Sequence, residues 1–204
     1  MTSSNYINTI DDYIKSNGKN SDVNNSEFFN KLFFTCPSTK IDTDTISLMT
    51  NQIASEFKIP YHDIKVIGSS HLGFSLVKPY GTNQLKLFNI DDSDIDFAIV
   101  NKELFYKIFS LTIKSTNFYS DLTTFSSPKN YNYYMNNLPL GFIRPDTIGD
   151  TEFRSTWLRF FEDMSHDFNI KTSAAIYLDE NCFRQRINKA FKIYIERMGL
   201  DGAK

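Results

Sequence analysis

Two aspartates separated by one residue, Asp94 and Asp96, begin the apolar segment 94–100, whose sequence is DIDFAIV. If this segment is a strand, residues i and i+2 point to the same face, so the two carboxylates lie side by side. Adjacent carboxylates repel each other unless a cation lies between them. Mg²⁺ prefers such oxygen ligands and takes its other ligands from water and substrate phosphates. We therefore predict a Mg²⁺ (or Mn²⁺) site at Asp94 and Asp96, suited to in-line displacement at phosphorus.

A second group of polar residues follows the apolar segment 64–67, which reads IKVI and is typical of a short buried strand. Gly68 lets the backbone come close to a bound group, because it has no Cβ. A short helix after Ser69 would direct backbone N–H groups at phosphate oxygens, and Ser69 and Ser70 add hydroxyl donors. His71 either donates to a phosphate or is a surface or helix-cap histidine. We predict that residues 68–71 bind the triphosphate of a nucleotide.

Together these two motifs, VIGSSHLGFS at 66–75 and SDIDFAIV at 93–100, resemble the nucleotidyltransferase superfamily that includes DNA polymerase beta. Minimal and antiphage-type bacterial nucleotidyltransferases belong to the same superfamily. The resemblance covers roughly residues 64–100. It implies a magnesium-dependent enzyme that transfers a nucleoside monophosphate from an NTP or dNTP to a hydroxyl and releases pyrophosphate. Asp94 and Asp96 would be its catalytic and metal-binding residues.

The chain departs from the family pattern in two ways. Asp94 lies 25 positions after Ser69, a longer separation than usual, so segment 76–89 is predicted to be an inserted loop or hairpin. Active members also carry a third carboxylate on a later strand, often as the base for the attacking hydroxyl. The strand predicted at 169–178 has no acid in its interior. The third carboxylate is therefore either absent or one of four residues outside that strand: Asp146, Asp150, Asp167 and Asp179.

Further basic residues could assist in binding the nucleotide. Arg144 either reaches a phosphate or pairs with Asp146, and Lys171 could neutralise part of the triphosphate. The basic residues of the last predicted helix are expected to form a solvated face instead: Arg184, Arg186 and Lys189.

The pattern of apolar residues predicts the elements that hold these motifs. Strands are expected at 64–67, 94–100 and 169–178, with helices between and around them and an irregular connection at 119–137. Thr151 and Asp179 are predicted to cap the last two helices. This arrangement is an α/β (α+β) fold with a small mixed central sheet flanked by helices. We expect one nucleotidyltransferase-like domain over 1–204, with N-terminal helices at 1–58, a catalytic sheet core at 59–178 and a C-terminal helix at 179–204.

Bulk composition limits the possible partners. The formal charge of −2 gives no sign of a large surface for duplex DNA. The two cysteines, Cys36 and Cys182, form no metal-binding motif and are expected to be free thiols in a reducing compartment. The sequence has neither a secretory signal nor a stretch of about 20 apolar residues that could span a membrane. We expect a soluble, cytoplasmic protein.

Three hypotheses follow. The first is an active nucleotidyltransferase whose acceptor is a nucleotide or oligonucleotide, a tRNA end or a protein. By family analogy it would serve in antiphage defence or a toxin–antitoxin pair, with a possible partner effector protein. The second is an inactive module of the same fold, or an antitoxin, that binds a nucleotide or a partner protein. The third is an interaction protein whose motif arose by chance.

Overall fold

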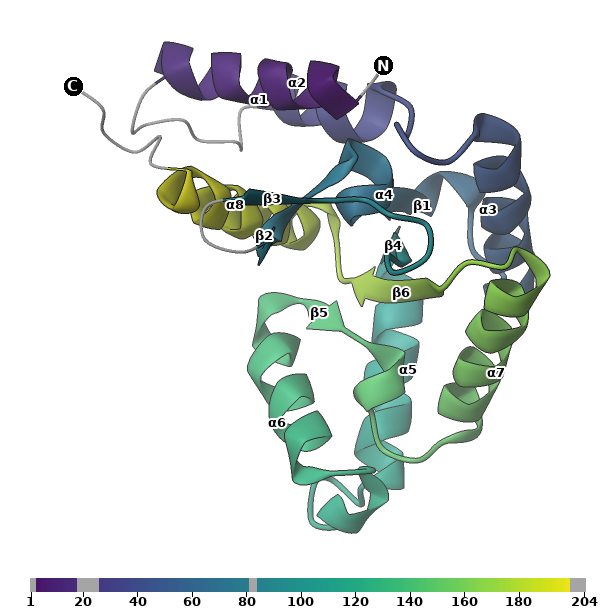
Figure 1. Ribbon diagram of the computed structural model, residues 1–204. Coiled ribbons are helices and arrows are strands. Elements are labelled where there is room, and N and C mark those ends of the chain that lie inside the picture. Colours follow the sequence, from purple (N-terminus) through teal and green to yellow (C-terminus); the bar gives the residue numbers. More distant parts are fainter. Residues whose placement is uncertain (1–2, 18–25, 81–83, 199–204) are drawn as a thin grey trace.

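A computed structural model describes residues 3–17, 26–80 and 84–198. Within these ranges, four strands form a sheet in the order β1-β4-β6-β5: β1 (Ile64–Ile67), β4 (Ile95–Val100), β6 (Thr172–Tyr177) and β5 (Phe142–Ile143). β4 is antiparallel to β1 and parallel to β6, and β5 is antiparallel to β6. Helices cover the sheet (Figure 1), so the predicted mixed α+β fold is confirmed.

The alternation of side chains along β4 divides the interior into two cores. Ile95, Phe97 and Ile99 belong to one buried cluster, whereas Ala98 belongs to the other. Asp96 points to the same face as Ala98, because side chains two residues apart share a face. This face of β4 is therefore the one that presents the acidic motif.

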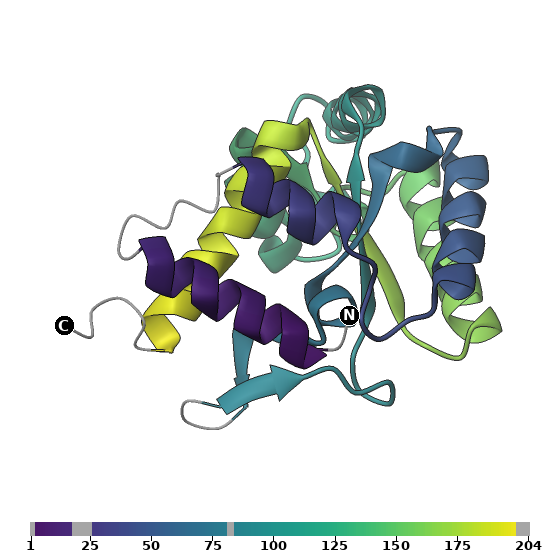
Figure 2. The ribbon, with the colours of Figure 1, turned by 90° about the horizontal axis from the view of Figure 1, so that it is seen from above.

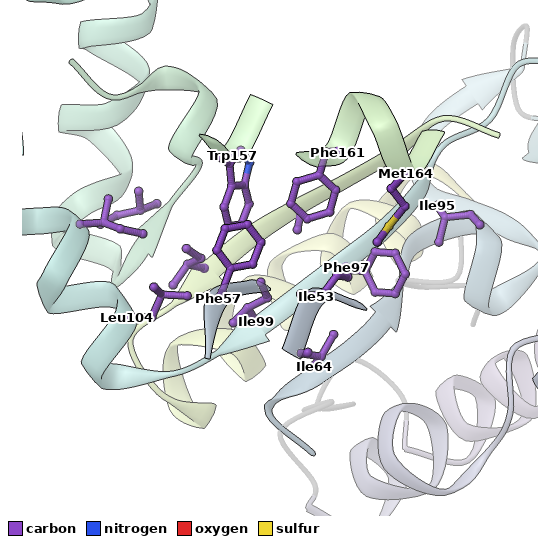
Figure 3. Close-up of a cluster of buried hydrophobic side chains, with 14 of the residues drawn as sticks. Ile53, Phe57, Ile64, Ile95, Phe97, Ile99, Leu104, Trp157, Phe161 and Met164 are labelled. Carbon is purple, nitrogen blue, oxygen red and sulfur yellow. The ribbon is translucent and has the colours of Figure 1, made fainter. Parts of the chain in front are cut away.

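The first core lies between the sheet and three helices, α3 (Thr43–Phe57), α5 (Lys102–Ser115) and α7 (Glu152–Asp167). Figure 2 shows α3 and α7 side by side, and Figure 3 shows the aromatic and aliphatic side chains that join them to β4. The ring of Phe57 lies 4.8 Å from that of Trp157, centroid to centroid. This layer supports the sheet from the face opposite to Asp96.

The second core lies between the sheet, the helices at the two ends of the chain and the short helix that follows β1. Its helices are α1 (Ser3–Asn17), α2 (Ser26–Asn30), α4 (Gly68–Leu72) and α8 (Glu180–Arg197). A π-helical turn, Lys31–Thr35, follows α2. In Figure 1, α1 lies above α8, on the opposite side of the sheet from α5 and α7. The inner face of α8 packs into this core, where four of its residues are buried: Phe183, Ile187, Phe191 and Tyr194.

The segment predicted as an insertion forms a β-hairpin. β2 (Phe74–Tyr80) pairs antiparallel with β3 (Gln84–Leu87), and residues 81–83 between them lie outside the described ranges. The hairpin begins before residue 76, because Phe74 already pairs with Leu87. It follows α4 directly and therefore stands beside the acidic motif rather than extending the main sheet.

The prediction of an irregular connection at 119–137 was wrong for its second half, which is helix α6 (Pro128–Asn137). Ser127 caps this helix by accepting a hydrogen bond from the Asn130 amide, and Pro128 occupies its first turn. Tyr134 is buried against Phe125, with ring centroids 5.8 Å apart. Packing of aromatic residues therefore stabilises a helix whose polar composition is typical of a loop.

The helix starts predicted from capping residues are confirmed. Thr151 accepts a hydrogen bond from the Arg154 amide at 3.0 Å, and Asp179 accepts one from the Cys182 amide at 2.8 Å. None of the helices in the described part of the chain has the length and apolar character needed to cross a membrane.

Candidate active site

The acidic motif lies at the junction of three strands. Asp94 immediately precedes β4, and Asp96 is its second residue. In the sheet register Asp96 stands opposite Ile67 of β1 on one side and Ser173 of β6 on the other. The Ser173 hydroxyl donates a hydrogen bond to Oδ1 of Asp96 at 2.7 Å. The neighbouring strand therefore fixes the orientation of this carboxylate.

Gly68 brings the other motif into contact with Asp96. Its φ of +70° lies in the left-handed region that favours glycine. A Cβ placed on Gly68 would lie 3.0 Å from Oδ2 of Asp96, closer than such atoms normally approach. The positive φ and this close approach both favour glycine at position 68, because a larger residue would be strained and would displace the Asp96 carboxylate.

These two motifs open into one pocket of about 300 Å³ between α4, α8 and the hairpin. Gly68, Ser69, Asp94 and Asp96, all predicted as site residues, contribute to its wall. The rest of the wall is apolar on one side, with Phe33, Leu72, Leu76, Val77, Ile187 and Ala190. The pocket thus combines an acidic edge with an apolar wall, the general character of a small-molecule site.

Ser70 and His71, predicted to bind phosphate, face away from this pocket. The Ser70 hydroxyl donates to the carbonyl of Ile67 at 3.0 Å. His71 is buried, and its Nε2 donates to the carbonyl of Leu32 at 2.7 Å. Burial lowers the pKa of His71, although the hydrogen bond to Leu32 acts in the opposite direction. Both residues hold α4 against the N-terminal segment, and neither lines the pocket.

Arg144 and Lys171 also lie outside the pocket. Arg144 donates two hydrogen bonds to the Asp146 carboxylate, at 3.1 and 2.7 Å, which is the ion pair considered as the alternative to phosphate binding. Burial acts to lower the pKa of Arg144, but the interaction with Asp146 raises it overall. Lys171 is exposed and precedes β6, where its carbonyl accepts a hydrogen bond from the Ile95 amide at 2.7 Å. Each lines a different hollow beside the pocket.

None of the four candidates for a third carboxylate reaches the pocket. Asp146 pairs with Arg144, and Asp179 caps α8. Asp150 is exposed after the short helical turn that follows β5, and Asp167 is exposed at the end of α7. The strand position beside Asp96 holds Ser173 instead. The third acid that lines the pocket is Asp92, which precedes the motif by two residues.

Sequence reasoning missed two basic residues of the pocket, Lys86 and Arg186. Lys86 lies on β3, inside the segment interpreted as an insertion. Arg186 lies on α8 and was assigned to a solvated face together with Arg184. Its position one residue before the buried Ile187 was the available signal, because a residue beside the inner stripe of a helix lies at the edge of that stripe.

The donor set fits a magnesium ion held partly by substrate. Within residues 3–17, 26–80 and 84–198, no group of three or more His, Cys, Asp and Glu side chains is arranged to enclose a metal. An ion bound by Asp94 and Asp96 would complete its shell with water and phosphate oxygens, as Mg²⁺ commonly does. The residues present therefore suit an ion that enters with a nucleotide.

Comparison with protein-family models, with curated proteins and with solved structures finds no match for this chain.

Proposed function

We propose that the chain is a nucleotidyltransferase that uses Mg²⁺ or Mn²⁺ to transfer a nucleoside monophosphate from an NTP or dNTP to a hydroxyl acceptor. The observation that carries this proposal is the contact between the two motifs. Gly68 and Asp96 are far apart in the sequence, yet a Cβ on Gly68 would lie only 3.0 Å from the Asp96 carboxylate. The packing of glycine turn against acidic strand agrees with the resemblance, which rests on these same residues.

The pocket residues would have different roles in the reaction. Ser69 and the backbone at Gly68 line the part of the pocket next to Asp96, where phosphate oxygens would be bound. Asp94 and Asp96 would hold the metal, which neutralises charge at the reacting phosphate when bound. The acceptor oxygen forms a bond to the α-phosphorus, the bond from that phosphorus to the bridging oxygen breaks, and pyrophosphate leaves. The hydroxyl proton is lost to solvent or to a carboxylate of the pocket.

The acceptor classes that suit this chemistry are a nucleotide or oligonucleotide, a tRNA end and a protein hydroxyl. A role in bacterial antiphage defence or in a toxin–antitoxin pair, with a partner effector protein, rests on the resemblance alone.

The test is transfer of label from each α-labelled NTP and dNTP, with Mg²⁺ or Mn²⁺, alone and with added tRNA or cell extract. Wild-type protein is compared with Asp94→Asn/Asp96→Asn. Asp91→Asn is the matched control, because Asp91 is exposed beside the motif and does not line the pocket. We expect label in a free product, in tRNA or on a protein, which the control keeps and the double variant loses. Label that persists in the double variant would contradict the proposal.

A second candidate function is a nucleotide-binding module or antitoxin that lacks catalysis. Ser173 favours it, because this serine occupies the strand position beside Asp96 where a third carboxylate would complete the site. Such a module would show no transfer of label but would be stabilised by nucleotide and Mg²⁺. A ligand at about 100 times its dissociation constant stabilises a protein by about 2.7 kcal/mol, which a thermal shift detects. The absence of both label transfer and stabilisation by nucleotide would favour the third hypothesis, in which the motif arose by chance.

A further inference from the structure

Phe118, just beyond the end of α5, is the most exposed large apolar residue in the described part of the chain, at 79%. It lies in the middle of a turn in which three consecutive residues other than glycine have a positive φ. The values are +46° at Asn117, +55° at Phe118 and +62° at Tyr119. Residues other than glycine and asparagine rarely adopt this conformation, because it is strained. The chain therefore accepts backbone strain where it displays an aromatic side chain to solvent.

Hydrogen bonds hold this strained turn in one conformation. The Phe118 amide donates to the carbonyl of Ile113 at 2.8 Å, and the Asp121 amide donates to the carbonyl of Thr116 at 2.9 Å. The Tyr119 amide donates to the hydroxyl of Thr116 at 3.1 Å, and Thr116 is itself buried. Phe118 is thus presented on a fixed turn. Strain that the surrounding structure maintains in this way points to a function for the residue that it displays.

The exposed face of α5 leads from this turn along the outside of the protein. Its exposed residues recur at a spacing of three or four, which places them in one stripe: Glu103, Tyr106, Lys107, Ser110 and Lys114. In Figure 2, α5 (teal) is viewed nearly along its axis at the edge of the molecule. Glu103 in the first turn and Lys114 in the last turn lie about 16 Å apart along the axis. Neither forms an ion pair with another described residue.

A hollow of about 620 Å³ adjoins this stripe, between the first half of α5, the end of α3 and the start of α7. Glu103 and Lys107 belong to both the stripe and the wall of this α5 hollow. Three further wall residues are apolar and bulky: Phe57, Leu104 and Phe153. An apolar floor with a charged rim is typical of protein–protein interfaces. One chain therefore carries an exposed aromatic side chain at one end of α5 and a hollow that could accept it at the other end.

We propose that the chain forms a two-fold symmetric dimer in which the α5 helices pair antiparallel and Phe118 of each copy enters the α5 hollow of the other. A two-fold axis near the middle of α5 brings the end of one helix to the start of the other, which is where the hollow lies. The same axis places Glu103 of each copy beside Lys114 of the other, so the charges are complementary. Every contact then occurs twice, as in any two-fold interface.

This interface is independent of the proposed transfer reaction. α5 covers the face of the sheet opposite to Asp96, so dimer formation leaves the pocket between α4, α8 and the hairpin open. Association and label transfer are therefore measured separately, and the failure of one proposal does not decide the other.

Sedimentation equilibrium from micromolar to millimolar concentration tests the dimer. Phe118→Asn removes the ring but suits the left-handed turn. We expect it to weaken dimerisation by about 100-fold, or about tenfold for each of the two contacts. At a concentration where wild type is monomeric, its melting temperature should equal or exceed that of wild type. Leu87→Asn, at a side chain 58% exposed on the hairpin, is the matched control and should dimerise like wild type. A wild-type chain that stays monomeric throughout, or unchanged dimerisation of Phe118→Asn, would overturn the inference.

Charge reversal tests the antiparallel pairing of α5. Glu103→Lys and Lys114→Glu each bring like charges together, so each should weaken the dimer by about fivefold or more. The variant that carries both changes restores opposite charges across the interface and should dimerise like wild type. Reduced helix stability cannot imitate this recovery, because each single change opposes the helix dipole and the double variant contains both. No recovery in the double variant, or assembly into chains longer than dimers, would contradict the two-fold arrangement.

Discussion

At the scale of single residues, the hydrogen bond from Ser173 to Asp96 controls the geometry of the candidate metal site. The bond is 2.7 Å long and joins two adjacent strands of the sheet. A hydrogen bond to one oxygen of a metal-binding carboxylate orients it, and loss of such a bond typically costs about 10- to 100-fold in metal affinity or activity. Ser173 is therefore a positioning residue for Asp96, in the place where the resemblance leads one to expect a carboxylate.

Substitutions at Ser173 test this role and the presence of a cation. Ser173→Ala should weaken Mn²⁺ binding by about tenfold, whereas Ser173→Thr keeps a hydroxyl and should bind more nearly like wild type. Ser173→Asp adds a further carboxylate next to Asp94 and Asp96, and like charges repel. Its melting temperature should therefore fall in the presence of a chelator and recover with Mn²⁺. A melting temperature that is equally low with and without Mn²⁺ would show that no cation binds between these carboxylates.

At the scale of elements, the N-terminal cap of α8 determines the position of Arg186 on the pocket wall. Asp179 caps the helix through the Cys182 amide, and this backbone hydrogen bond lowers the pKa of Asp179. The cap satisfies an amide that has no partner within the helix. Arg186 lies about two turns further along, so a well-defined helix start also defines the direction of its side chain.

Two substitutions at Asp179 separate capping from catalysis. Asp179→Ala should destabilise the protein by about 1 kcal/mol, because alanine cannot accept the Cys182 hydrogen bond, whereas Asp179→Asn caps nearly as well. Stability is measured by urea unfolding at pH 7. Asp179→Asn should also retain full transfer activity. Its inactivity would instead identify Asp179 as the missing third carboxylate.

The lowered pKa also sets the pH dependence of this cap. Because Asp179 ionises more easily in the folded protein, its contribution is present above the unfolded-state pKa of about 3.9 and is lost as the pH falls below it. The difference in stability between wild type and Asp179→Ala should therefore shrink in acid.

The elements that could be predicted from the sequence are those whose apolar pattern and capping residues lie within the element itself. Apolar patterns and capping side chains located α7 and α8, and Gly68, Ser69 and the aspartate pair were assigned to one site from their motifs alone. The position of Ser173 could not be predicted, because it depends on the parallel register of β6 with β4. Helix α6 was missed because its stability comes from burial of Tyr134 rather than from a regular apolar pattern. The opposite directions of Ser69 and His71 depend on how α4 packs against the N-terminal segment, which lies far away in the sequence.

At the scale of the whole molecule, this N-terminal segment is part of the support of the site. Ser38 donates to the carbonyl of Ser70 at 2.6 Å, the Thr39 amide donates to the carbonyl of His71 at 2.9 Å, and His71 donates to Leu32. The rings of Tyr6 and Phe33 pack against the imidazole, with centroids 5.6 and 5.5 Å away. Segment 26–41 and α1 therefore fasten α4, and with it the glycine turn, to the body of the protein.

A neutral, buried His71 should make this attachment sensitive to acid. Burial holds its pKa below the ordinary value of 6.5, so the unfolded chain binds a proton more readily than the folded one. Stability should therefore fall as the pH drops through 6.5, by up to about 1.4 kcal/mol per pH unit, and stop falling below the folded-state pKa. His71→Gln keeps a donor for the Leu32 carbonyl but cannot titrate. The free energy of unfolding of this variant, measured with urea, should therefore lack this fall between pH 7.5 and 5.5. His166→Gln, at a side chain 91% exposed, is the control and should keep it. Equal slopes for wild type and His71→Gln would mean that protonation of His71 does not limit the stability of the N-terminal attachment.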